Sequence, residues 1–303
     1  MRTFLKIPLA VLIILGAIAA WLFGYDEPRV KEVKANNGCP SCDLKDASLW
    51  WIVLQDADLQ GADLSGANMW WTDLQRADLR NAKFIKSNLW WTDLRGAQLK
   101  GADLSGTELG RADLRGIKAA GSKLNSTGLS GANLTGGDFA GASLWRANLL
   151  QAIAREADFS RADLTEANFH AVDLTGSSFV GAKMIRTSMT KTKMAGVNMS
   201  GATLDGADLA GADMTKADLS NATLKGSDLP VADLTGANLK GADFAKANLT
   251  WSKLINADLK GANFADANLG SADLTGSDLT GANFEGARLC KTVMPTGMDN
   301  SGC

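Results

Sequence analysis

A large apolar side chain returns at every fifth position over most of this 303-residue chain. The series runs from Leu44 to Met294 without a slip in register, and its members are Leu, Phe or Met except at Ala119 and Ala154. Two residues before each of these positions stands a small residue, most often Ala. This period fits neither an α-helix, which repeats every 3.6 residues or so, nor a β-strand, which repeats about every two.

The period instead predicts a chain that turns a corner every five residues. We expect the large and small positions to point inward and the other three to point outward. Four such sides make a square coil of 20 residues, and aromatic residues recur at that spacing, which would place each set in one column of stacked coils. These sets are Phe139, Phe159 and Phe179; Phe244, Phe264 and Phe284; and the pairs Trp50-Trp51, Trp70-Trp71 and Trp90-Trp91.

Units such as Ala62-Asp63-Leu64-Ser65-Gly66 resemble the pentapeptide-repeat family, and the resemblance covers residues 42–294. It implies an all-β fold, a right-handed quadrilateral β-helix solenoid with Leu/Phe and Ala ladders inside. A solenoid of about 13 coils at a spacing of ~4.8 Å would be a rod roughly 60 Å long. We assign residues 39–294 to this β-helix and residues 295–303 to a C-terminal cap.

Residues 1–24 are predicted to be a membrane-targeting segment. Arg2 and Lys6 form a positive flank, and the stretch 7–23 that follows carries no charge and has about the shortest length that spans a bilayer as a helix. Ala17-Ile18-Ala19 is a small-x-small cleavage pattern, so a hydrophobic N-terminal signal-anchor helix and a cleaved signal peptide both stay open. In both cases the positive flank stays inside and the repeat domain is exported.

This segment sets the expected location. We predict a single-pass protein of a bacterial inner membrane with its repeat domain in the periplasm, or in a thylakoid lumen, and alternatively an exported soluble protein. Residues 25–38 are a linker in which 27–36 form a short helix over the first coil, because an open coil end is an unpaired edge.

Two cysteine pairs are candidate disulfides. Cys39-Pro-Ser-Cys42 has the spacing of a thiol–disulfide redox motif, but Cys42 falls on an inward small position, which favours a disulfide or buried thiol that closes the first coil. Asp43 stands where haem attachment requires His. A disulfide between Cys290 and Cys303 would pin the C-terminal cap, is permitted by export, and would stabilise by ~3 kcal/mol. The pairs lie at opposite ends of the rod, which excludes a zinc site built from all four cysteines.

The Trp-Trp pairs are the best candidates for binding. They occupy the two outward corner positions of one face on three consecutive coils, and a further Trp lies on the same face eight coils later. Such an apolar strip predicts contact with lipid headgroups, with sugar rings of a cell wall or with a protein partner. Mutual stacking that stiffens the first coils is the alternative. The candidate residues are Trp50, Trp51, Trp70, Trp71, Trp90, Trp91 and Trp251.

Nothing in the sequence predicts catalysis. The four consecutive Met centres of residues 184–199 supply every side of one coil, and flexible core filling is favoured over a metal-binding cluster. The single histidine, His170, has no nucleophile that would complete a triad. We therefore predict that the protein is not an enzyme and uses no cofactor or metal.

These patterns predict a non-catalytic scaffold on the outer face of an inner membrane. It would bind a protein partner, or a membrane or cell-wall surface, through its Trp-rich face, and an oligomer is compatible with the pattern. One alternative is a DNA-mimicking topoisomerase-binding protein, a role known for some pentapeptide-repeat proteins; the other is a thiol–disulfide protein that uses Cys39 and Cys42. The formal net charge of −2 is weak for a DNA mimic and gives no basic field for nucleic acid.

Overall fold

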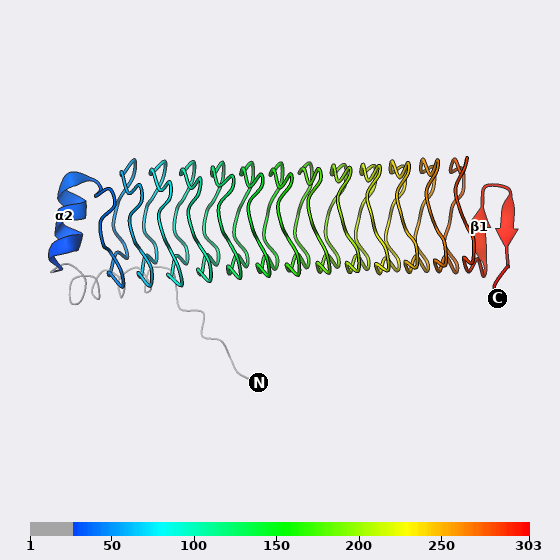
Figure 1. Cartoon of the computed structure of the whole chain (residues 1–303), viewed down its shortest axis with the longest axis horizontal. Helices are drawn as coiled ribbons and strands as arrows, with labels where there is room; N and C mark the ends of the chain where they lie inside the picture. Colours follow the sequence, from blue (N-terminus) through cyan, green and yellow to red (C-terminus); the bar gives the residue numbers. More distant parts are fainter. Residues whose placement is uncertain (1–26) are drawn as a thin grey trace, which may run out of the picture.

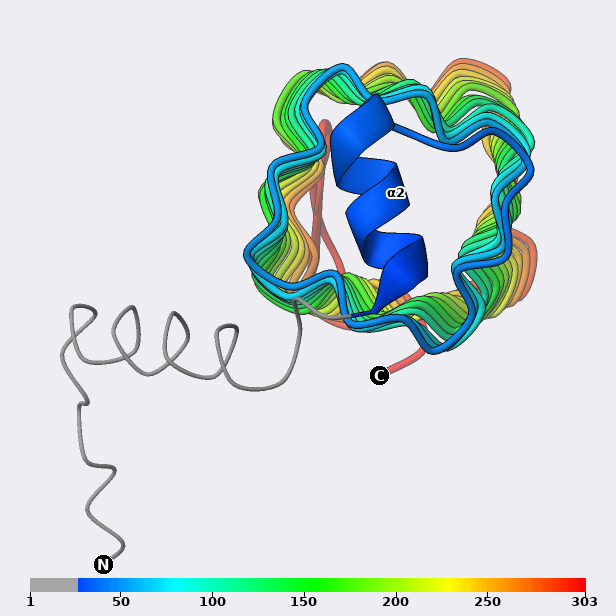
Figure 2. The same cartoon turned by 90° about the vertical axis from the view of Figure 1, so that its left-hand side faces the viewer.

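The computed structural model describes residues 27–303, which form one straight rod of square cross-section (Figures 1 and 2). The predicted membrane-targeting segment, residues 1–24, lies outside the described residues. Between residues 27 and 303, no helix is long and apolar enough to cross a bilayer. The named elements are the helix α2 (Pro28–Asn36) at one end of the rod and the strands β1 (Thr292–Met294) and β2 (Gly297–Asp299) at the other.

The rod is a stack of coils joined by parallel backbone bridges. Every bridge links a residue to the one 20 positions later, from Gly38 with Asp58 to Asp273 with Val293. This spacing confirms the 20-residue coil that the aromatic columns predict. The inward Leu64 N–H donates to the carbonyl of Lys83 at 2.7 Å in the next coil, so each coil is bonded to its neighbours on all sides.

Each corner is a tight turn closed by the small inward residue. Ala47 N–H, for example, donates to the Leu44 carbonyl at 3.1 Å. The third residue of the turn has a positive φ, as at Gly66 (71°) and Trp71 (60°). Glycine adopts this conformation at least cost, which explains its frequency at this position of the repeat.

The interior contains the two predicted ladders. Phe159 lies between Phe139 and Phe179, with ring centroids 5.1 and 5.0 Å away, which is close to the spacing of adjacent strands. The Met centres of residues 184–199 are fully buried on all four sides of one coil and form part of the core. Ala119 and Ala154, the two breaks in the large series, are also buried centres.

The helix α2 lies across the mouth of the first coil (Figure 2). It buries Val30 and Val33 completely against the core and ends at Asn37, which has a φ of 47°. Gly38 then makes the first bridge with Asp58 at a φ of 138°, and a Cβ at this position would lie 2.2 Å from the Asp58 carbonyl oxygen. Only glycine permits this approach.

At the other end, β1 and β2 form an antiparallel hairpin (Figure 1). β1 still belongs to the coil ladder, because Val293 bridges to Asp273. β2 is the next layer outward and runs in the opposite direction, with Met298 opposite Val293. The chain then continues over the neighbouring side, where Leu289 N–H donates to the Ser301 carbonyl at 2.9 Å.

Candidate binding corner

The Trp pairs share one corner of the rod. We call it the Trp corner: residues 50 and 51 and every pair 20 residues further on, to residues 290 and 291. In each coil these residues are the second and third of the turn. Trp51 N–H donates to the Trp70 carbonyl at 3.0 Å, and Trp71 N–H donates to the Trp90 carbonyl at 3.1 Å. The coil ladder therefore fixes the backbone of this corner, and the indoles are presented on a rigid support.

The third-position indoles form one stack along the rod. The ring centroids of Trp51 and Trp71 are 5.6 Å apart, and those of Trp71 and Trp91 are 5.2 Å apart with an interplanar angle of 6°. The Arg111 guanidinium continues the stack 5.0 Å from the Trp91 ring, a cation–π contact. Trp71 and Trp91 therefore present their indole edges to solvent, since both faces of each ring are occupied.

The second-position indole of Trp90 is held differently. A Cβ built on Gly110, its neighbour in the next coil, would lie 2.6 to 3.0 Å from three atoms of the indole. Trp90 therefore lies directly over the Gly110 backbone, in space that any other residue type would fill. It is 38% exposed and belongs to the last of the three Trp pairs along the Trp corner.

Beyond the last Trp pair, the surface of the Trp corner is recessed and forms a groove. Small residues follow the indoles along the corner, and the resulting cavity has a volume of about 510 Å³. An aromatic wall, a guanidinium and polar side chains surround one recess. Its lining residues are Trp90, Trp91, Arg111, Ser130, Gly131, Leu150 and Gln151.

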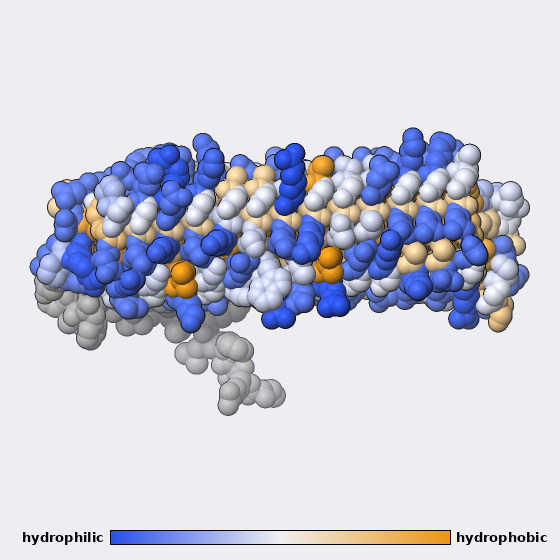
Figure 3. Space-filling view, in the orientation of Figure 1, coloured by the Kyte–Doolittle hydropathy of each residue, from blue (hydrophilic) through white to orange (hydrophobic). Residues whose placement is uncertain are grey.

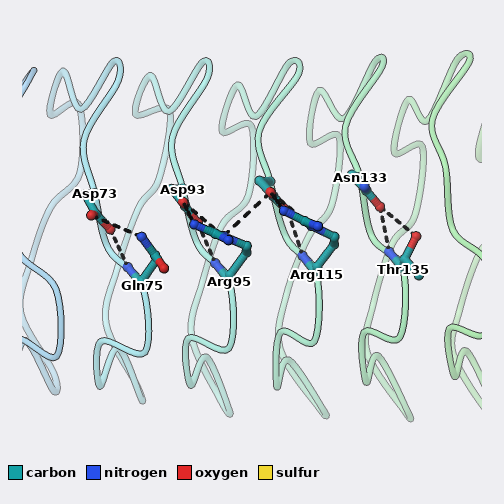
Figure 4. A network of polar contacts seen from close by, with 8 residues as sticks. Asp73, Gln75, Asp93, Arg95, Arg115, Asn133 and Thr135 are labelled. Atoms are coloured by element: carbon teal, nitrogen blue, oxygen red, sulfur yellow. Dashed lines mark hydrogen bonds and ion pairs between the residues drawn. The ribbon is translucent and has the colours of Figure 1, made fainter.

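The Trp corner carries no acidic residue from its first pair to its last, and its charged residues are Arg111, Lys191 and Lys291. Acidic side chains stand instead on the next side of the rod, where Figure 4 shows Asp93 paired with Arg95 of the same coil. Asp113 accepts from Arg115 at 2.6 Å, and Arg95 lies 3.7 Å away from it. Burial alone would raise the pKa of Asp113, but the hydrogen bonds from Arg115 outweigh it and hold that pKa below its ordinary value.

Two further apolar positions mark the far part of the Trp corner. Trp251 is 67% exposed, and Val231, one coil earlier, is 66% exposed. Sequence reasoning missed Val231. It also missed Trp145, which lies on the preceding corner under the guanidinium of Arg146, 4.3 Å from the ring centroid. Trp145 has no aromatic residue 20 positions away, so the periodicity that identified the other Trp residues could not identify it.

Exposed apolar groups are otherwise sparse. The face of the rod in Figure 3 is mainly hydrophilic or neutral, and strongly hydrophobic residues appear on it as isolated spots. A run of adjacent Trp residues is therefore unusual for this surface.

All four cysteines are paired. Cys39 and Cys42 form a disulfide in the first coil with a Cα–Cα distance of 5.5 Å, and both are partly buried against the core. Cys290 and Cys303 form the second disulfide, with a Cα–Cα distance of 4.6 Å. In the described part of the chain, no three His, Cys, Asp or Glu residues are grouped so that they could hold a metal ion. His170 contacts the Thr190 hydroxyl on the Trp corner.

These features define a four-sided β-helical solenoid with one aromatic corner and no catalytic constellation among the described residues. The model of pentapeptide repeats matches the sequence in eight segments, and the chain belongs to this family, whose fold is the right-handed β-helix. The matched segments are residues 42–81, 72–111, 97–136, 132–170, 162–201, 192–229, 232–261 and 257–294. No curated protein matches the sequence significantly.

Several solved structures are similar to the chain. HetL, a pentapeptide repeat protein involved in heterocyst differentiation regulation in the cyanobacterium Nostoc sp. strain PCC 7120, is 29% identical, with 91% of this chain and 98% of HetL covered and a TM-score of 0.29. A pentapeptide repeat protein of the Arabidopsis thaliana thylakoid lumen is 34% identical over 33% of this chain and 70% of its own, with a TM-score of 0.33. The plasmid-mediated fluoroquinolone resistance protein QnrB1 is 21% identical over 70% and 86%, with a TM-score of 0.24.

Proposed function

We propose that this protein is a non-catalytic scaffold that binds a protein partner through the Trp corner of its first coils. The repeat domain would stand on the outer face of an inner membrane, with residues 1–24 as its attachment. The observation that carries the proposal is the groove of about 510 Å³ between the Trp90–Trp91 wall and residues 150–151. Trp and Arg are the residue types that most often dominate the energy of protein interfaces.

The geometry of the indoles favours a protein over a carbohydrate. A sugar ring stacks on a free aromatic face, whereas Trp71 is covered on both faces by its neighbours and Trp91 is covered by Trp71 and Arg111. Indole edges, a guanidinium and a recess instead suit the irregular surface of a folded protein, where anchors fill pockets.

The charge pattern argues against the topoisomerase-binding alternative. A DNA mimic needs a continuous strip of unpaired carboxylates, whereas many aspartates of this rod pair with a Lys or Arg on the same or the next coil. Examples are Asp93 with Arg95 at 2.7 Å and Asp173 with Arg155 at 2.6 Å. The Trp corner itself has no acid. The thiol–disulfide alternative is disfavoured because Cys39 and Cys42 pack against the core of the first coil.

The test is a comparative pull-down of the full chain from intact membranes. We expect Trp90→Ser to weaken recovery of the bound protein at least about tenfold, since loss of a central interface Trp is among the costliest truncations. Gly110→Ala should act in the same direction, because the added methyl displaces the Trp90 indole without removing it. Circular dichroism should show the same fold in both variants.

Trp251→Ser is the matched control, since Trp251 lies on the same corner and is more exposed. It should leave recovery unchanged. Equal recovery with wild type and with Trp90→Ser would sink the proposal. A loss that occurs only with Trp251→Ser would move the binding surface to the far part of the rod.

A further inference from the structure

The C-terminal end of the rod is only half closed. Leu279 and Phe284, the large centres of two sides of the last coil, are partly exposed, whereas Leu259 and Phe264 one coil earlier are fully buried. A cavity of about 440 Å³ opens at this end beside Leu279 and Pro295. The core is therefore uncovered here, in contrast to the end that α2 covers.

The same two sides have free backbone edges. One coil earlier, Leu259 N–H donates to the Asp278 carbonyl at 2.9 Å, and Phe264 N–H donates to the Asn283 carbonyl at 2.7 Å. The equivalent N–H groups of Leu279 and Phe284 have no backbone acceptor within residues 27–303. Such an edge is a template for pairing with another strand.

The other two sides of the last coil each carry one additional layer of backbone. β2 lies on the side of Val293, and the Ser301 carbonyl accepts from Leu289 on the side before it. The disulfide between Cys303 and Cys290 holds this extra layer at the corner between them. The end of the rod is thus a step, with residues 297–303 as its raised half and the edges at 278–279 and 283–284 as its lowered half.

The raised half also ends in a free edge. In a hairpin with a two-residue turn, the pair beside the turn is hydrogen-bonded and the next pair is not. Here Met294 with Gly297 is the first pair and Val293 with Met298 is the second. The N–H and carbonyl of Met298 therefore point away from β1, out of the end of the rod.

We infer that two copies of this chain join end to end through these steps. A two-fold axis across the rod, along the step, places the raised half of each copy on the lowered half of the other. β2 of one copy then pairs with the edge at Asp278 of the second copy, and residues 301–303 pair with the edge at Asn283. The raised half of each copy thus fills the lowered half of the other, and the ladder of backbone hydrogen bonds continues from one copy into the next.

The direction of the strands agrees with this joint. β2 runs antiparallel to the coils of its own chain, and the two-fold rotation also reverses the coils of the second copy, so β2 runs parallel to the strand edge that it meets. All bridges between coils within the rod are parallel. The interface is isologous, with each contact made twice, and it covers Leu279 and Phe284 of both copies.

Substitution of Met298 tests the joint without disturbing the fold of a single chain. It is 67% exposed and would stand beside Asp278 of the second copy on the outside of the ladder. Met298→Glu places like charges opposite each other twice and should weaken dimerisation about tenfold or more. Met298→Lys faces the same carboxylate with a cation and should keep the dimer.

The experiment uses the full chain in detergent, with mass from analytical ultracentrifugation and length from negative-stain electron microscopy. Wild type should have twice the 31.8 kDa of one chain and form rods about 120 Å long, against about 60 Å for one copy. Val231→Glu is the matched control, because Val231 is equally exposed but lies on a coil corner away from the end. It should stay dimeric.

Asp278→Lys combined with Met298→Glu should restore the dimer by opposite charge. A monomeric wild type at every concentration examined would overturn the inference, and so would a dimer of unchanged rod length, which would lie side by side. A dimer that Met298→Glu leaves intact would also overturn it. Met298 and Asp278 lie away from the Trp corner, so for their variants partner recovery and dimerisation are separate measurements.

Discussion

At the scale of single residues, the third turn position is where the repeat accepts most backbone strain. Glycine often holds it, yet Arg111, Val231 and Trp251 also adopt φ values of 56° to 61° there. A β-branched residue is the least suited to this conformation. These residues remain because the hydrogen bonds of the coils above and below fix the turn, as from Val231 N–H to the Thr250 carbonyl at 3.0 Å.

Replacing Val231 by Gly should therefore stabilise the rod. The φ of 59° costs a β-branched side chain about 1 kcal/mol or more, and an exposed valine contributes little packing in return. We expect the free energy of unfolding to rise by about 1 kcal/mol, measured by urea denaturation. Gly211→Val, one coil earlier on the same corner, is the reverse change and should destabilise. A loss of stability in Val231→Gly would show that its side chain packs better than its exposure indicates.

At the scale of elements, the two ends of the rod are covered by different means and to different extents. α2 covers its coil with two fully buried valines. The hairpin of β1 and β2 buries much less, because Gly297 lies opposite Met294 and adds no side chain over the core. The closure at that end therefore depends on the covalent bond between Cys290 and Cys303.

Replacing Cys290 and Cys303 by Ser should loosen only the C-terminal end. The disulfide closes a loop with a sequence separation of 13 residues, for which chain entropy predicts about 3 kcal/mol. Because each coil contacts only its neighbours, we expect faster hydrogen exchange over residues 288–303 and unchanged exchange in the middle of the rod. The double Ser variant of Cys39 and Cys42 should show its effect at the first coil. Faster exchange along the whole rod would contradict a local role.

At the scale of the whole molecule, charged side chains form ion pairs along the rod, many of them between neighbouring coils, as Arg76 does with Asp56 at 2.6 Å. Lowered aspartate pKa values occur along its length, as at Asp63, where the Ser65 hydroxyl is the main cause, and at Asp233, where hydrogen bonds from Thr235 outweigh the effect of burial. The strongest case is Asp278, whose pKa is lowered from 3.8 to about 2 by the Thr280 hydroxyl and then by Lys260.

These pKa shifts predict that the rod is stable near neutral pH and loses stability in acid. A carboxylate with a lowered folded pKa contributes stability above its unfolded pKa of 3.8, and that stability is lost as the pH falls toward about 2. We expect the urea midpoint to be constant between about pH 6 and pH 8 and to fall steadily below about pH 4. Asp278→Asn should reduce this slope. A midpoint that rises as the pH falls below 4 would show that carboxylate repulsion outweighs the pairing.

The sequence by itself determined the coil of this protein. A strict period of five fixes which side chains point inward, and neighbours 20 residues apart place every residue in a column. The Phe stacks, the buried Met coil and the shared corner of the Trp pairs all follow from that arithmetic. This is possible because each residue meets nearly the same local surroundings, so position in the repeat specifies position in space.

Only the tertiary structure decided how the Trp corner is presented and how the rod ends. Side-chain direction depends on particular neighbours: Arg111 covers Trp91, and Gly110 leaves room for Trp90. Residues 295–303 leave the period, so nothing periodic indicated that they would run back as an antiparallel layer over two sides. A repeat determines what is common to its units, whereas a binding surface and an open end arise where units differ, and there packing between specific side chains and strands decides.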